Sequence, residues 1–135
     1  MEESYVLNLQ KQYQKFSDFY FCYCGHAHCE PLHSYGPAVR PNYLLHYILD
    51  GQGIYRVEGQ EYVLGKGQGF LVPPNRQTFY QASEQNPWTY LWIGFDGGNC
   101  ETCLRAIGLG EGQLTFRYEN GGELLQLVEA MLTHN

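Results

Sequence analysis

The sequence predicts a small, mainly β domain, built as an antiparallel barrel or sandwich. Between Tyr43 and Phe95, short segments rich in aromatic and branched residues alternate with turns of Gly, Pro and Asn, which is the pattern of short strands joined by hairpins. These turns are too short for the crossover helices of a parallel α/β sheet. After Phe95 the apolar spacing changes from two to roughly 3.6 residues, which indicates helices.

The expected strands cover residues 19–25, 43–49, 54–57, 61–64, 70–72, 78–82 and 88–95. Residues 1–18 are polar with scattered apolar positions, and we expect either a mobile arm or an edge strand. Residues 26–41 contain Pro31, Pro37 and Pro41, so they are expected to form a long surface loop.

Two helices are expected after the last strand. Asn99 is a typical N-cap and Gly108 a typical stop for the first helix. Glu123 completes a capping box for a second helix that begins near Asn120. One apolar stripe runs along this second helix and consists of Leu124, Leu127, Val128 and Met131. The stripe packs either on the barrel or on the same helix of a second subunit.

Length and composition exclude several classes of function. A chain of 135 residues is long enough for one domain with a core, and its net charge of −6 argues against nucleic-acid binding, which needs a basic face. No apolar run approaches the ~18 residues of a membrane helix, and the segment 1–4 is not typical of a signal peptide. Five cysteines, an odd number, indicate reduced thiols more than a disulfide framework. We therefore expect a cytoplasmic protein.

A group of cysteines and histidines raises the question of a metal site. The group consists of Cys22, Cys24, His26, His28, Cys29 and His33. Their spacing fits no closed zinc site, and a core or loop role accounts for them. We predict no metal and no cofactor.

Catalytic motifs are also missing from the sequence. There is no nucleophile elbow, P-loop or dinucleotide fingerprint. Glu58 and Glu61 flank an expected hairpin tip, where they are most simply solvated charges and do not form an acid/base pair. We assign no catalytic residue.

The last strand separates its side chains by parity. Trp88, Tyr90 and Trp92 share one face, and this face suits either a pocket that stacks on a pyranose ring or an ordinary core. Tyr80 could add a hydroxyl group to such a pocket. Arg40 is either a fixed cation of the pocket or a surface charge.

The hairpin formed by residues 47–51 and 69–74 resembles the core signature of the cupin superfamily. In metal-binding cupins two histidines and a glutamate surround the first half of that signature, and a further histidine follows the proline. By this resemblance the ligand positions fall at about Ala38, Arg40, Leu44 and Thr78, so all four ligands are absent. The resemblance therefore implies a cupin-like, double-stranded β-barrel (jelly roll) without the metal, followed by the two helices.

A longer run of motifs is similar to the effector-binding domain of AraC-type transcriptional regulators, in particular the sugar-responsive members. The motifs are residues 33–37, Arg40, residues 43–53, residues 73–74 and residues 87–97. In that family the barrel binds a small effector, an N-terminal arm can close over it, helices after the barrel dimerise, and a C-terminal pair of helix-turn-helix units binds DNA. The resemblance places Tyr90 and Trp92 in the pocket wall, Tyr80 on the preceding strand, Arg40 near the family's sugar-contacting arginine, and His46 by its strand alone. Together with Trp88, which shares the face of Tyr90 and Trp92, these are the predicted ligand-binding residues.

The sequence thus predicts an effector-sensing and dimerisation domain of a transcription regulator, not an enzyme. The expected organisation is an arm over 1–18, a ligand-binding barrel over 19–97 and a helical dimerisation segment over 98–135. The expected effector is a mono- or disaccharide, the expected assembly is a homodimer, DNA contact is expected only through a further domain, and no membrane contact is expected. A small metal-independent sugar isomerase or epimerase is the alternative, and a metal sensor that uses the Cys/His loop over 22–33 is a third reading.

Overall fold

The computed structural model describes residues 3–8, 20–96, 104, 105, 108–110, 112–119 and 122, with the backbone alone for residues 3–8 and 20–23. Within these residues the chain forms ten strands, which pair antiparallel. They are β1 (Glu3–Asn8), β2 (Tyr20–His28), β3 (Ser34–Val39), β4 (Tyr43–Asp50), β5 (Gln52–Val57), β6 (Gln60–Gly65), β7 (Gln68–Val72), β8 (Gln77–Ala82), β9 (Thr89–Asp96) and β10 (Thr115–Arg117).

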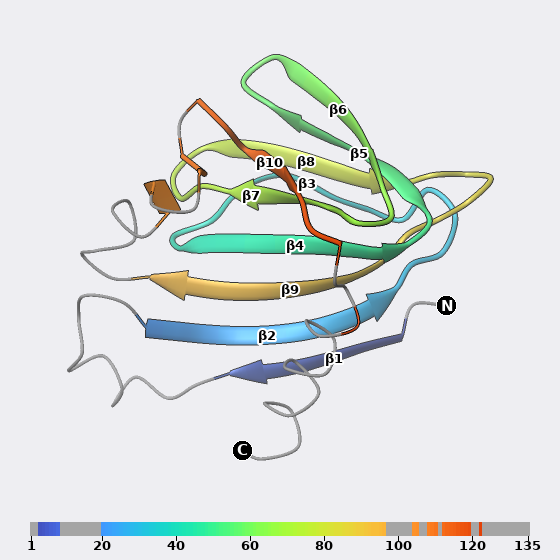
Figure 1. Ribbon diagram of the computed structural model, residues 1–135, viewed down its shortest axis with the longest axis horizontal. Coiled ribbons are helices and arrows are strands. Elements are labelled where there is room, and N and C mark those ends of the chain that lie inside the picture. Colours follow the sequence, from blue (N-terminus) through green and yellow to red (C-terminus); the bar gives the residue numbers. More distant parts are fainter. Residues whose placement is uncertain are drawn as a thin grey trace.

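The strands form two sheets (Figure 1). The larger sheet has the strand order β1-β2-β9-β4-β7-β10, and the smaller has the order β3-β8-β5-β6. Consecutive strands often belong to different sheets, so the chain crosses repeatedly between the two layers in the manner of a jelly roll. The mainly β prediction is confirmed.

The main core lies between the two sheets. Along β4, Leu44, His46 and Ile48 are buried on the face toward the smaller sheet, as the two-residue period of a strand requires. Aromatic and aliphatic side chains from both sheets complete this core, among them Tyr55, Val57, Leu64, Phe70, Val72, Tyr80, Ala82, Trp88 and Tyr90. The prediction that Trp88, Tyr90 and Trp92 share the inward face of the last strand therefore agrees with the structure.

A second cluster covers the outer face of the larger sheet. Cys24, Tyr47 and Leu91 are buried there, and Phe116 packs against them. The hydroxyl group of Tyr47 donates a 2.5 Å hydrogen bond to the carbonyl of Tyr118. Residues 116 and 118, in and next to β10, are thereby attached to the back of β4.

The predicted loop over 26–41 is wrong in its extent. The strand β2 continues through His28, and residues 34–39 form β3 at the edge of the smaller sheet. Pro37 lies where the register between β3 and β8 shifts, between Tyr35 and Ala38. Proline is tolerated at bulges and on edge strands, and for this reason it does not exclude a strand here.

The region after β9 is described in part. Gly108 has a φ of 86°, and the amide groups of Leu109 and Gly108 donate hydrogen bonds to the carbonyls of Leu104 and Arg105. These two bonds form a Schellman motif, at the residue where the first helix is expected to stop. The rest of that helix, and the second helix with its stripe at Leu124, Leu127, Val128 and Met131, fall largely or wholly outside the described residues. The strand β10, which the sequence analysis missed, lies between the two expected helices.

At the N-terminus, β1 pairs with β2 along the edge of the larger sheet (Figure 1). Of the two expectations for residues 1–18, an edge strand is what the structure has for residues 3–8. Residues 9–19 lie outside the described part of the chain. Among the residues that are described, no helix is long and apolar enough to span a membrane.

Candidate functional site

His46 lies at the centre of the aromatic core between the sheets. It is 1 % exposed, and its ring stacks on Phe70 with centroids 4.5 Å apart. The rings of Tyr80 and Tyr90 approach it at 4.7 and 4.8 Å from two further directions. A polar side chain is thus enclosed by aromatic rings from β7, β8 and β9.

The Nδ1 atom of His46 is buried and has no hydrogen-bond partner among the residues that the structure describes. Buried polar atoms nearly always have a partner, and leaving one unpaired costs about 1–3 kcal/mol. This atom is the feature of the core that packing does not explain.

The imidazole of His46 is uncharged at neutral pH. Burial lowers its pKa well below the usual value, and the positive charge of Arg40 lowers it further. In a neutral imidazole one ring nitrogen donates and the other accepts a hydrogen bond. His46 can therefore interact with a hydroxyl group through either tautomer and adds no charge to the site.

The two tryptophans of the predicted site are buried to different extents. Trp88 is fully buried, with its ring 5.8 Å from that of Phe70 and 5.9 Å from that of Tyr90. Trp92 is half-buried, and its ring meets Tyr90 edge to face at 5.7 Å. Trp88 therefore forms the wall behind the cluster, whereas Trp92 presents an accessible aromatic surface next to Tyr90.

Arg40 joins the cluster through Tyr35. Its guanidinium group lies 4.3 Å from the centre of the Tyr35 ring, and that ring stacks on Tyr80 at 5.6 Å and 15°. The backbone also holds Arg40, because its carbonyl accepts a hydrogen bond from the amide of Asn75 in the turn after β7. Arg40 is half-buried.

The structure thus brings together the predicted set Arg40, His46, Tyr80, Trp88, Tyr90 and Trp92, while their role as ligand contacts stays a prediction. Sequence reasoning missed two members of the cluster. Tyr35 fell in the segment that was expected to be a loop. Phe70 lies on β7, where the continuous apolar run over residues 70–72 indicates a buried strand but does not single out one side chain.

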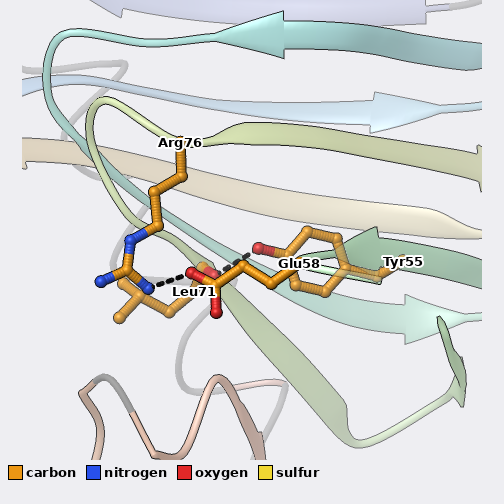
Figure 2. Close-up of polar contacts among 4 residues, drawn as sticks. All are labelled: Tyr55, Glu58, Leu71 and Arg76. Carbon is orange, nitrogen blue, oxygen red and sulfur yellow. Dashed lines mark hydrogen bonds and ion pairs between the residues drawn. The ribbon is translucent and has the colours of Figure 1, made fainter. Parts of the chain in front are cut away.

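The polar contacts outside this cluster have structural roles. Figure 2 shows the hydroxyl group of Tyr55 donating a buried 2.7 Å hydrogen bond to the carbonyl of Leu71, and Arg76 pairing with Glu58. Burial raises the pKa of the Tyr55 phenol. Glu61 pairs with Arg56 at 2.6 Å. Both glutamates near the hairpin tip are therefore ion-paired, a more specific arrangement than the solvated charges expected.

The described residues hold no group of three or more His, Cys, Asp or Glu side chains that could bind a metal. His28 contacts the hydroxyl group of Thr89 through Nδ1 at 2.6 Å, and its ring centre lies 5.8 Å from that of His26. Cys100 and Cys103, which form a C-x-x-C pair in the sequence, lie outside the described residues.

A separate cleft of about 790 Å³ lies between the turn after β7 and the segment that leads to β10. Leu71, Leu104 and Leu114 contribute apolar lining, and Arg76 and Arg105 contribute guanidinium groups. None of the predicted ligand-binding residues lines this cleft.

Comparison with known proteins gives consistent matches. The domain family described as "AraC-like ligand binding domain" matches residues 23–134. The Msm operon regulatory protein of Streptococcus mutans is 36% identical over 107 residues, which are 76% of this chain and 38% of that protein. The raffinose operon transcriptional regulatory protein of Pediococcus pentosaceus is 40% identical over 55% of this chain and 27% of its own length. The lactose operon transcription activator of Staphylococcus xylosus is 33% identical over 66% of this chain and 32% of its own length.

These relatives are transcriptional regulators, and the chain spans only 27–38% of their length. Among solved structures, YhaK from Escherichia coli superposes with a TM-score of 0.65 at 17% identity, covering 87% of this chain and 52% of that one. A cupin superfamily protein from Desulfitobacterium hafniense gives 0.56 at 14% identity, covering 71% and 78%. At such identities the likeness shows the fold alone, and the fold is a cupin-like jelly roll.

Proposed function

The chain belongs to the AraC-like ligand-binding domain family, and we propose that it is the sugar-sensing domain of a transcription regulator. The relatives named above regulate operons whose printed names include raffinose, a trisaccharide, and lactose, a disaccharide, which supports a sugar as the effector, and we propose a mono- or disaccharide. The aromatic cluster around His46 is the proposed binding site. DNA contact is assigned to a part of the protein outside these 135 residues, because a net charge of −6 does not suit a phosphate backbone.

The unpaired Nδ1 of His46 is the observation that carries this proposal. It is buried among three aromatic rings, those of Phe70, Tyr80 and Tyr90, so the cost of leaving it unpaired is present in the ligand-free chain. A sugar hydroxyl group would give it a partner, while the apolar face of the pyranose packs against Trp92 and Tyr90. Arg40 would donate hydrogen bonds to further sugar oxygens.

We propose that binding of the sugar changes how two copies of the chain associate. The stripe Leu124, Leu127, Val128 and Met131 is the proposed dimer contact. Ligand acts on this equilibrium only to the extent that it binds one arrangement more tightly than the other. Residues 1–18 are the proposed lid, since β1 already lies along the edge of the sheet that carries His46.

A thermal-unfolding screen against raffinose, lactose, melibiose, glucose, galactose and arabinose tests the proposal. A sugar at about 100 times its dissociation constant should stabilise the chain by roughly 2.7 kcal/mol, a shift of several degrees in a domain of this size. Chromatography of the sugar afterwards should recover it unchanged. A panel without any shift would contradict sugar sensing, and conversion of the sugar would instead favour the isomerase alternative.

A further inference from the structure

We infer that Tyr35 is a positioning residue, whose ring holds the guanidinium group of Arg40 at the rim of the aromatic cluster. The inference rests on the proposed function, because it concerns the sugar site described there. No catalytic role is involved, since Tyr35 is argued to act on the ligand through Arg40.

The ring of Tyr35 lies between Tyr80 and Arg40 in one stack. Tyr35 and Tyr80 are register partners on β3 and β8, and their rings stack at 5.6 Å. Tyr80 is buried and approaches His46, so the ring beneath Tyr35 is fixed by the core. The guanidinium group of Arg40 lies 4.3 Å from the Tyr35 ring centre. Tyr35 thus connects a half-buried cation to the buried centre of the site.

Tyr35 is 42% exposed, although it lies on the same face of its sheet as the buried Tyr80. A tyrosine that served only to fill the core would be covered, as Tyr55 is. At an edge strand its ring instead offers a flat, electron-rich surface, and a guanidinium group binds such a surface well.

Ring contacts through Tyr35 and Tyr80 connect the guanidinium group of Arg40 to His46. The positive charge of Arg40 also helps to lower the pKa of that buried histidine. An arginine loses much rotamer freedom when it binds a ligand, and a side chain that is already ordered loses less. Tyr35 would raise ligand affinity in this way without touching the ligand.

A double-mutant cycle measured by calorimetry, with each sugar that stabilises the wild-type chain in the panel above, tests this role. Arg40→Met should weaken binding about 10- to 150-fold, and Tyr35→Leu about two- to fivefold. In the Arg40→Met background, Tyr35→Leu should change affinity less than twofold, because the group it positions is gone. Equal losses in both backgrounds would overturn the inference and make Tyr35 a structural or direct contact.

Two matched variants separate positioning from general damage. Tyr35→Phe keeps the ring face and should retain wild-type affinity, so a loss in this variant would overturn the inference. Tyr118→Leu makes the same change at another exposed tyrosine, which packs against Tyr47 and not against Arg40. Its affinity should not change, and a loss equal to that of Tyr35→Leu would also count against a specific role.

A nuclear magnetic resonance measurement without ligand tests the contact between Tyr35 and Arg40 independently of sugar binding. The ring current of Tyr35 should shift the side-chain proton resonances of Arg40, and the shift should persist in Tyr35→Phe and vanish in Tyr35→Leu. If these resonances are the same in all three chains, the positioning contact is refuted. If the contact is present but no sugar binds the wild-type chain, the proposed function fails and the positioning role for a sugar fails with it.

Discussion

Replacement of His46 by phenylalanine separates the stability of the fold from the affinity for a ligand. Phenylalanine keeps a flat ring between Phe70, Tyr80 and Tyr90 but removes the buried, unpaired Nδ1. If that atom is kept for a ligand, the substitution should leave the unfolding free energy within about 2 kcal/mol of the wild-type value, yet it should weaken sugar binding.

The structure sets the size of both effects. Removing an unpaired buried polar atom recovers about 1–3 kcal/mol. The larger ring must fit among neighbours whose centres lie 4.5–4.8 Å away, and such overpacking costs about 1–3 kcal/mol. The net change in unfolding free energy should therefore lie between about −2 and +2 kcal/mol. Loss of the hydrogen bond to a sugar hydroxyl should weaken binding about five- to 150-fold.

The assay combines urea unfolding with calorimetric titration of the sugar that stabilises the wild-type chain. His28→Phe is the matched control, because His28 is exposed and its Nδ1 already contacts Thr89. His46→Gln keeps a polar group and should lose less affinity than His46→Phe. A His46→Phe chain that is more than about 2 kcal/mol less stable but binds sugar normally would refute the reasoning, because His46 would then be a satisfied core residue.

The same residue predicts a dependence of stability on pH. The pKa of His46 is lower in the folded chain than in the unfolded chain, so the unfolded chain binds the additional proton first as the pH falls. The contribution of His46 to the unfolding free energy should be fully present above the ordinary histidine pKa of about 6.5. Below that pH the unfolding free energy should decline, with a limiting slope of about 1.4 kcal/mol per pH unit from this group. His46→Phe should remove that contribution. Parallel stability profiles for wild type and variant between pH 7.5 and 5 would count against a buried neutral imidazole.

Three further substitutions test the core and the assembly. Tyr55→Phe deletes the donor of the buried 2.7 Å hydrogen bond to the Leu71 carbonyl and should lower the unfolding free energy by about 1–2 kcal/mol, measured in urea; an unchanged midpoint would mean that water replaces the bond. Gly53→Ala places a Cβ against the ring of Trp88 and should lower the unfolding free energy by about 1–3 kcal/mol. The near-ultraviolet circular dichroism of tryptophan should change as well. A fully stable variant would show that the ring can move. Leu127→Glu should convert a dimer to a folded monomer in sedimentation experiments, and an unchanged dimer would place the interface elsewhere.

Much of the fold was predictable because it depends on local patterns. The strands from residue 43 onward were found from apolar alternation and turn residues, which report on burial and backbone shape. The strand β3 was missed because Pro37 was read as a loop signal, and only the pairing of strands shows that this proline lies at an edge. The strand β10 has three residues, too few to display a period, and it is held by pairing with β7.

The candidate site shows where sequence reasoning stops. Parity put Trp88, Tyr90 and Trp92 on one face, but a core and a pocket both require inward rings, so parity could not distinguish them. The distinction depends on whether each buried polar atom has a partner, and that is a property of the assembled structure. The Nδ1 atom of His46 has none among the described residues, whereas the buried hydroxyl group of Tyr55 has one. It is this difference between two buried polar side chains, and not the abundance of aromatic rings, that favours a ligand site around His46.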